Sequence, residues 1–261
     1  MKLICLNIWG GQIYEPLIKF VREQAESTDI FCFQEVYRSP RKDIEVSSKT
    51  RINILDELSG ALPDFNYVFH PVLSGFDNSG PIDLNIEMGQ VEFVKKSFPI
   101  VSSGEVSLYS SRSDAASRKQ TFSPSEFGYS RISNGDSGIT LINVHALTYH
   151  PDDKLDTPER LEQSRLIKKF AIKEKGNVII CGDFNILPEA ESVKTFGDSF
   201  VDLIKKYDIK TTRSKISPWY GKPNELKFSD YAFVSPTLKI LNFQVPDVEI
   251  SDHLPLIMEF R

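Results

Sequence analysis

The sequence predicts an α+β sandwich in which helices cover the outer faces of β-sheets. Eight runs rich in β-branched and aromatic residues, each bounded by turn residues, are typical of strands. Amphipathic helical patterns lie between several of these runs, which favours sheets covered by helices. The predicted strands are Lys2–Asn7, Ile30–Gln34, Tyr67–His70, Gln90–Val94, Ile139–His145, Val178–Cys181, Phe228–Val234 and Leu254–Phe260.

Two of the helical patterns have recognisable ends. Apolar residues at i, i+3 and i+4 spacing predict a helix over Glu15–Glu26, with Pro16 in its first turn, where the missing N–H of proline costs no hydrogen bond. Thr157 is a candidate N-cap and Pro158 follows it, so a second helix is expected from there to a stop near Gly176.

No repeat and no low-complexity linker divides the 261 residues, so we expect a single domain over residues 1–261. A composition of 40% hydrophobic and 26% charged residues is that of an ordinary globular chain. The longest apolar runs are far shorter than the roughly 20 residues that a membrane-spanning helix needs, so no membrane association is expected. Two stretches without strand or helix patterns, Arg38–Thr50 and Ser102–Glu126, are expected to be surface loops.

The net charge and the placement of the cysteines further limit which class of protein this can be. The net charge of −5 argues against a protein that coats nucleic acid through a uniformly basic surface, although it leaves room for a local basic cleft. The N-terminus enters an apolar, strand-like run at once and carries no signal-peptide pattern. Cys5, Cys32 and Cys181 lie far apart within apolar runs, which is typical of buried reduced thiols. We therefore expect a cytoplasmic protein.

Polar side chains that could take part in catalysis recur where the predicted strands end or begin. A single such residue is usually a strand-end cap or a turn residue with a local hydrogen bond. Six such places along one chain are harder to explain in that way, and they would form a site if the fold brings these strand ends to one edge. The residues are Asn7, Glu35, His145, Asp183 with Asn185, Asp230, and Asp252 with His253.

The donor types within this set favour a hard cation. Asn7, Glu35, Asp183, Asn185 and Asp252 all offer oxygen, and neither a cysteine pair nor an HExxH-like pattern accompanies them. Oxygen donors suit Mg²⁺ or Mn²⁺ and do not suit a structural zinc. A hard cation held by one or two carboxylates, with histidines nearby to move protons, is typical equipment for hydrolysing a phosphoester.

The motifs around these residues resemble those of the endonuclease/exonuclease/phosphatase superfamily of metal-dependent phosphoesterases. In chain order they are LNIWG, FQEV, NVHAL, GDFN, SDY and SDHLP. Their order is similar to that of the family over essentially the whole chain, and GDFN together with SDHLP is the most specific part. The resemblance implies a DNase I-like fold, a four-layer α/β/β/α sandwich of two packed mixed β-sheets flanked by helices, with a metal site at one edge of the sheets.

The resemblance also implies a role for each oxygen donor. Glu35 would be the principal metal ligand, with Asn7 and Asp252 near it. Asp183 would orient or deprotonate the attacking water, and Asn185 would hold a phosphate oxygen.

Two histidines and a further aspartate complete the implied site. His253 would bind or protonate the phosphoryl group, and Asp230 would fix its tautomer and raise its pKa. His145 would be a second histidine beside the phosphate, with Glu87 or Glu92 as candidates to orient it. On the residues alone, Asp230 is also explicable as a turn residue and His145 as a strand-end polar residue.

A basic segment lies between the GDFN and SDY motifs. Seven basic residues against two acidic ones give Lys205–Lys227 a local charge of +5 within an acidic protein. Basic side chains interleaved with aromatic rings are what single-stranded nucleic acid requires, so Arg213, Lys215, Trp219 and Tyr220 are candidate substrate-binding residues. A solvated loop whose aromatic rings pack on the domain would explain the same composition.

These observations together predict a divalent-metal-dependent phosphodiesterase acting on nucleic acid, with Mg²⁺ or Mn²⁺ as cofactor and no obligate protein partner. The nearest alternative is a phosphatase or phosphodiesterase on a small or lipid-linked phosphate, such as an inositol phosphate. The third hypothesis is a non-catalytic binding domain of the same fold. The presence of Glu35, Asp183 and His253 argues against it, because loss of activity should remove such residues first.

Overall fold

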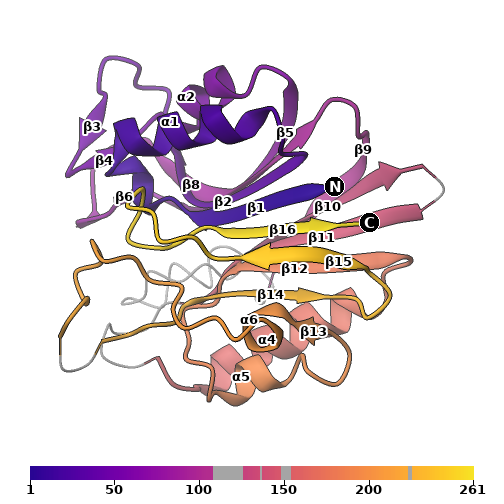
Figure 1. Cartoon of the computed structure of the whole chain (residues 1–261). Helices are drawn as coiled ribbons and strands as arrows, with labels where there is room; N and C mark the ends of the chain where they lie inside the picture. The colour runs from indigo at the N-terminus through magenta and orange to yellow at the C-terminus, as the bar shows by residue number, and fades with distance from the viewer. Residues whose placement is uncertain (108–125, 136, 148–153, 223–224) are drawn as a thin grey trace.

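Two six-stranded β-sheets lie face to face in the computed structural model, and helices cover the outer face of each (Figure 1). The structure describes residues 1–107, 126–135, 137–147, 154–222 and 225–261. This arrangement confirms the predicted four-layer α/β/β/α sandwich. Within the described residues, no helix has the length and apolar character needed to span a membrane.

The first sheet joins strands from both ends of the chain. Its N-terminal strand β1 lies between β16 and β2, antiparallel to the former and parallel to the latter. In spatial order the strands are β15 (Ile240–Gln244), β16 (Leu256–Phe260), β1 (Lys2–Asn7), β2 (Ile30–Arg38), β8 (Glu87–Lys95) and β5 (Phe65–Ser74). Two short hairpins accompany it, β3 (Val46–Ser47) with β4 (Thr50–Arg51) and β6 (Phe76–Asp77) with β7 (Gly80–Pro81).

The second sheet is built from the middle of the chain. Its two central strands, β11 and β12, pair in parallel, whereas their outer neighbours β10 and β14 run antiparallel to them. In spatial order the strands are β13 (Val201–Asp202), β14 (Asp230–Val234), β12 (Asn177–Asp183), β11 (Ser137–His145), β10 (Glu126–Asn134) and β9 (Ile100–Ser107).

The helices form the two outer layers (Figure 1). Thr157 caps α4 as predicted, because its side chain accepts a hydrogen bond from the backbone N–H of Arg160, and Pro158 occupies the first turn. This helix ends at Ala171, earlier than the predicted stop near Gly176. The helices are α1 (Tyr14–Ala25) and α2 (Ile54–Ala61) on the first sheet and α4 (Pro158–Ala171), α5 (Glu191–Lys194) and α6 (Leu203–Lys206) on the second, with a 3₁₀ turn, η1 (Trp9–Gly11), after β1.

Alternation along β1 divides its side chains between two apolar cores. Leu3 and Cys5 belong to the core that includes the space between the sheets, whereas Ile4 and Leu6 belong to the core beneath α1 and α2. Asn7 has the parity of Cys5, so the strand presents it toward the second sheet. The three cysteines are buried and free, as predicted.

Both parallel strand pairs end at one edge of the sandwich. Asn7 is the last residue of β1 and pairs with Gln34 of β2, while His145 at the end of β11 pairs with Asp183 at the end of β12. Carboxyl ends of parallel neighbours lie at the same edge of a sheet, and in open α/β sheets this edge is where ligands bind. The fold therefore brings the predicted strand-end residues of both sheets to one place.

Several elements had no strong sequence signal. The predicted loop Ser102–Glu126 overlaps most of β9 and the first residue of β10, and residues 108–125 of that stretch lie outside the described part of the chain. β9 is an edge strand with the sequence IVSSGEVS, whose residues alternate between half-buried and exposed. Serine, glycine and glutamate separate its apolar residues, which is why no strand was predicted there. The predicted loop Arg38–Thr50 contributes to the small β3–β4 hairpin, and α2 and β15 were not predicted.

A buried polar cluster lies between the sheets, away from the apolar core. His70 of β5 is 3% exposed, its Nε2 lies 3.0 Å from Glu92 Oε2, and its Nδ1 lies 3.7 Å from Glu105 Oε1 of the second sheet. Burial alone would lower the pKa of His70, but the carboxylates of Glu92 and Glu105 outweigh it and raise the pKa. Gly128 permits this contact, because a Cβ there would lie 2.1 Å from the His70 ring.

The substitution Glu92→Gln should lower the pKa of His70, because burial then outweighs the remaining charge of Glu105. In the wild-type protein, the raised pKa means that protonated His70 stabilises the fold fully below about pH 6.5, the usual histidine value, and that this contribution is lost as pH rises through the folded-state pKa. NMR titration of the imidazoles, with His70→Gln to assign the signal, measures the shift. Glu87→Gln, which alters an exposed partner of Arg38, is the matched control. An unchanged His70 pKa in Glu92→Gln would contradict this account.

Candidate active site

Seven of the eight strand-end residues predicted from sequence are linked by contacts of 4.0 Å or less at the edge where β1, β2, β11 and β12 end, and Asn185 joins them through its backbone. They lie at strand ends, in the turn after β12, at the bulge of β2 or in the loop before β16, and all but Glu35 are at most 6% exposed. They are Asn7, Glu35, His145, Asp183, Asn185, Asp230, Asp252 and His253.

The amide of Asn7 joins the two sheets. Its Nδ2 donates hydrogen bonds of 3.0 Å both to Glu35 Oε1 of the first sheet and to Asp183 Oδ2 of the second. Its Oδ1 accepts the backbone N–H of Trp9. In this orientation Asn7 is a donor to two carboxylates, and its oxygen accepts a hydrogen bond from the η1 turn.

Glu35 reaches the site through a β-bulge. The register of β2 with β8 shifts between Phe33 and Val36, and the φ of Glu35 is +55°, in the left-handed region. Regular alternation after Gln34 would direct Glu35 toward the helices, so the bulge is what returns its carboxylate to the side of Asn7. A left-handed glutamate costs about 1–3 kcal/mol and is found mostly where function requires it.

The charges around Glu35 fit a divalent cation. Burial, with the nearby carboxylates of Asp252 and Asp183, raises the pKa of Glu35 to about 8. Its side chain keeps 20% of its exposure, so an ion from solvent can reach it. Like charges gathered at a buried edge are unfavourable unless a cation compensates them, and carboxylate oxygens are the ligands that Mg²⁺ and Mn²⁺ prefer.

Asp183 is the most highly connected carboxylate of the site. Its Oδ1 accepts hydrogen bonds from the backbone N–H of Asn185 at 2.8 Å and from Ser229 Oγ at 2.6 Å. Burial alone would raise the pKa of Asp183, but His253, Lys154 and His145 together lower it below its usual range. Asp183 is therefore fixed in orientation and ionised.

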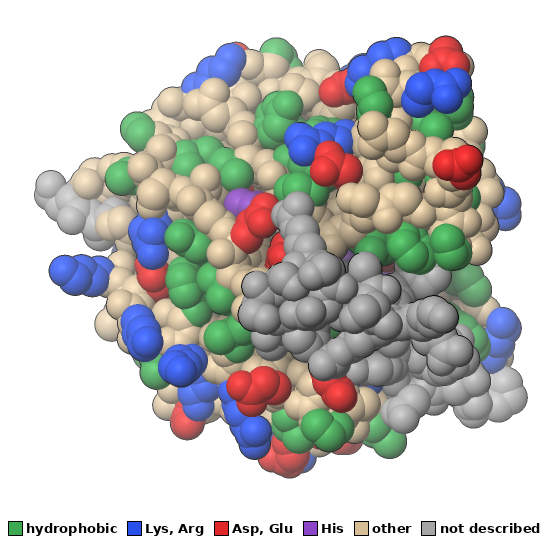
Figure 2. All heavy atoms as spheres, turned by 180° about the vertical axis from the view of Figure 1, so that it is seen from behind, with side chains coloured by type: hydrophobic (Ala, Val, Ile, Leu, Met, Phe, Trp, Pro, Cys, Tyr) green, Lys and Arg blue, Asp and Glu red, His purple; other side chains and the backbone are tan. Residues whose placement is uncertain are grey.

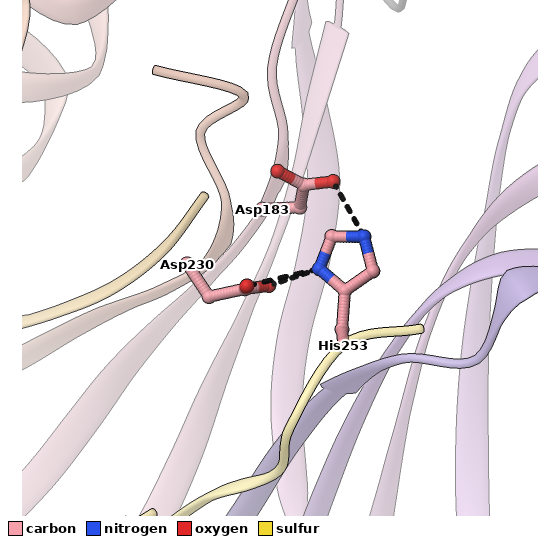
Figure 3. Close-up of side chains that lie close together, drawn as sticks. All are labelled: Asp183, Asp230 and His253. Atoms are coloured by element: carbon pink, nitrogen blue, oxygen red, sulfur yellow. Dashed lines mark hydrogen bonds and ion pairs between the residues drawn. The ribbon is translucent and has the colours of Figure 1, made fainter. Parts of the chain in front are cut away.

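His253 lies between two aspartates (Figure 3). Its Nδ1 is 2.9 Å from Asp230 Oδ2, and its Nε2 is 3.6 Å from Asp183 Oδ2. Nε2 also contacts Nη1 of Arg213. Asp230 thus contacts Nδ1 with both carboxylate oxygens, and Nε2 faces the guanidinium of Arg213.

The pKa expected for His253 requires a correction. The sequence led us to expect that Asp230 raises it, but burial and the adjacent Arg213 guanidinium lower it to about 4. Burial and Asp183 raise the pKa of Asp230 well above its usual range. The pair shares a low-dielectric position beside a fixed cation, which makes neutral imidazole the stable form when no phosphate is bound.

His145 faces the same centre from β11. Its Nε2 lies 3.8 Å from Glu35 Oε1 and 3.9 Å from Asp183 Oδ2, and burial lowers its pKa to about 4. Its Nδ1 has no hydrogen-bond partner among the described residues. The two carboxylates suggested to orient it are engaged elsewhere, since Glu92 contacts His70 and Glu87 pairs with Arg38.

One group of three possible metal-ligating side chains also converges within the described residues. One ligand atom from each of Asp183, Asp230 and His253 lies within 4.8 Å of the others. Both carboxylate oxygens of Asp230 already lie within 3.0 Å of His253 Nδ1, however, so this chain of contacts orients the imidazole. Asp252 pairs with Arg213, and Glu35 accepts a hydrogen bond from Asn7 through Oε1. Among the described residues no contact engages Oε2 of Glu35, which leaves Glu35 as the candidate cation ligand.

Sequence reasoning missed three residues of the site. Thr212 Oγ1 accepts the backbone N–H groups of Ser229 and Asp230, and Ser229 in turn supports Asp183. Lys154, 7% exposed, contacts Asn185 Oδ1 through its Nζ. Ser229 belongs to the SDY motif and could have been found there, whereas nothing in the local sequence marks Thr212 or Lys154.

The basic segment contributes one residue to the site directly. Arg213 contacts His253 and lies 3.3 Å from Asp252 Oδ2. Lys215 instead pairs with Asp247, and the Trp219 ring lies 5.0 Å from Lys222 Nζ. Tyr220 is 52% exposed. Of the four candidate substrate-binding residues, the structure therefore brings Arg213 into contact with the strand-end residues.

The glycine of the GDFN motif is required by the backbone. Gly182 has a φ of +144°, and a Cβ there would lie 1.9 Å from the carbonyl oxygen of Val144 on the parallel neighbour β11.

Gly182→Ala should therefore lower the free energy of unfolding by about 2–4 kcal/mol, from backbone strain and steric overlap together. Chemical denaturation measures it. Gly60→Ala, at an open position of α2, is the matched control and should be neutral or stabilising. Equal stability of Gly182→Ala and wild type would contradict the argument.

Comparison with known proteins agrees with this geometry. The model of the Endonuclease/Exonuclease/phosphatase family matches residues 4–253. No curated protein matched the chain.

Solved structures share the fold over the whole chain at low sequence identity. An endonuclease/exonuclease/phosphatase family protein from Leptotrichia buccalis C-1013-b is 19% identical with a TM-score of 0.72, covering 100% of this chain and 99% of that one. A mannosyl-6-phosphatase of Bacteroides thetaiotaomicron VPI-5482 is 16% identical with a TM-score of 0.67 and the same coverage. The human Nocturnin catalytic domain, solved with a bound sulfate anion, is 18% identical with a TM-score of 0.63, covering 100% and 93%. The chain belongs to the endonuclease/exonuclease/phosphatase family, whose members are generally hydrolytic phosphoesterases and typically depend on a divalent metal.

Proposed function

We propose that this protein is a divalent-metal-dependent phosphodiesterase that cleaves nucleic acid. The observation that carries the proposal is the pairing of the basic segment Lys205–Lys227 with the loop that holds His253. Arg213 forms a β-bridge with His253, the backbone N–H of Ser214 donates to Asp252 O at 3.0 Å, and that of Leu254 donates to Thr212 O at 2.8 Å.

Because of this pairing, the segment begins at the site and leads away from it, as a binding path for a polymeric substrate would. Arg213 lies at the site, and the chain continues from it through Lys215 to the exposed ring of Tyr220. A nucleic acid whose scissile phosphate lies beside His253 would find further cations and aromatic rings along this path, with phosphates on the cations and bases on the rings. Of the residues in this segment, a small phosphate would contact only Arg213.

The surface charge supports a local binding path. Among the described residues on the face shown in Figure 2, Lys and Arg side chains are intermixed with Asp and Glu. With a net charge of −5, attraction of a polyanion has to come from local groups. The segment Lys205–Lys227, with a local charge of +5, supplies them.

The chemistry follows from the geometry of the site. Glu35, with Asp252 nearby, would hold Mg²⁺ or Mn²⁺, which supplies Lewis-acid stabilisation of phosphate oxygens when bound. Asp183, fixed by Ser229 and the backbone of Asn185, accepts a hydrogen bond from the attacking water and orients it.

Arg213 and the two histidines serve the phosphate. Arg213 donates to anionic oxygens, and a phosphate beside His253 raises the pKa of that imidazole, so His253 can then share a proton through Nε2. His145 lies near both Glu35 and Asp183. We also propose a cytoplasmic location, which the three free, buried thiols support.

End-labelled single- and double-stranded DNA and RNA should be cleaved in the presence of Mg²⁺ or Mn²⁺. Asp183→Asn keeps the shape of the side chain but removes its charge, and it should reduce the rate by about 10²- to 10⁴-fold, the usual contribution of a positioned acid–base group. Gel electrophoresis of the products measures both. Asp198→Asn, at an exposed partner of Lys168, is the matched control and should retain full activity.

Two results would overturn the proposal. Intact nucleic acid together with metal-dependent release of phosphate from inositol phosphates would establish a small-molecule phosphatase. Absence of both reactions in wild-type protein would favour a binding domain that keeps the fold without the activity.

A further inference from the structure

A lysine that no motif contains lies inside the site. Lys154 precedes α4, is 7% exposed, and contacts Asn185 Oδ1 through its Nζ. Its charge acts on Asp183, whose pKa it helps to lower. Lys154 is thus on the Asn185 side of Asp183, whereas Glu35 adjoins the other oxygen of that carboxylate through Asn7.

The backbone holds Lys154 in this place. Its carbonyl oxygen accepts the N–H of Leu187 at 3.0 Å. Two residues later, Asp156 accepts the N–H groups of Glu191 at 2.7 Å and Ser192 at 3.0 Å, at the start of α5. The lysine is therefore fixed against the same turn that carries Asn185, so the two side chains keep their relative position.

Among the described residues, the ammonium group of Lys154 forms no ion pair. No carboxylate oxygen lies within 4.0 Å of Nζ among the residues that the structure describes, and Asn185 Oδ1 is its one hydrogen-bond acceptor there. An ammonium has three donors, and burying it without a partner costs several kcal/mol. A buried ammonium group of this kind is explained if a bound anion accepts its remaining hydrogen bonds and balances its charge.

We propose that Lys154 binds a non-bridging oxygen of the substrate phosphate together with Asn185. This inference rests on the proposed phosphoesterase function and deepens it. The phosphate would be held by two fixed cations, Lys154 on the Asn185 side and Arg213 on the His253 side, in addition to the ion near Glu35. The charge of a phosphodiester would then be compensated mainly by the protein's own side chains.

Calorimetric titration with tungstate, a tetrahedral dianion, tests this without turnover. Lys154→Met keeps the length of the side chain and removes its charge, and it should weaken tungstate binding by about 10- to 100-fold, the effect of losing one charge-assisted hydrogen bond. Lys154→Arg should restore part of the affinity. Lys19→Met, at an exposed position of α1, is the matched control and should bind as wild type does.

Thermal unfolding separates binding from a structural role. If Lys154 serves the phosphate, Lys154→Met should unfold at the same temperature as wild type or higher, because a buried charge without a carboxylate in contact is gone. Lower thermal stability with unchanged tungstate affinity would assign Lys154 to support of Asn185 and overturn the inference.

Activity distinguishes failure of this inference from failure of the proposed function. Wild-type cleavage of nucleic acid, with Lys154→Met equal to wild type in tungstate affinity and KM, would overturn the role of Lys154 alone. Tungstate binding that depends on Lys154, in a protein that cleaves no phosphoester, would support the anion site and contradict the proposed function.

Discussion

The amide of Asn7 is the contact on which the geometry of the site depends. It donates to Glu35 in its own sheet and to Asp183 in the facing sheet, so it fixes the distance between two carboxylates that belong to different layers. Strand parity places it there, because Asn7 continues the inward-facing series of Leu3 and Cys5. The site is therefore a property of how the two sheets are stacked, and neither sheet contains it alone.

Stacking the sheets in this way brings several carboxylates close together. The surrounding residues differ on the two sides of this cluster. On the side of Asp230, both carboxylate oxygens contact His253, and His253 in turn contacts Arg213. On the side of Glu35, Asn7 and His145 contact the carboxylate, but burial and the neighbouring carboxylates of Asp252 and Asp183 still raise the pKa of Glu35. A divalent cation at Glu35 and an anionic substrate between Arg213 and Lys154 would together complete the electrostatics of the edge.

The sequence predicted those parts of the molecule that depend on local pattern. Inner strands such as β1 are short apolar runs bounded by polar residues, and α4 carries its own capping residues, so both could be placed without a structure. The site residues in GDFN and SDHLP could be named because they follow strands. What local pattern cannot give is contact between distant segments, which is why Lys154 and Thr212 were missed and why the effect of Arg213 on the pKa of His253 was not foreseen. The bulge at Glu35 was likewise invisible, because only pairing with β8 reveals it.

Binding of Mn²⁺, followed by electron paramagnetic resonance of the free ion, tests most directly whether the cation belongs to Glu35. The wild-type protein, Glu35→Gln and Asp230→Asn should be compared at equal concentration. Our account predicts that Glu35→Gln loses the tight site and that Asp230→Asn keeps it, because Asp230 serves the His253 imidazole. Retention of the site in Glu35→Gln with loss in Asp230→Asn would place the ion among Asp183, Asp230 and His253 and would contradict the account.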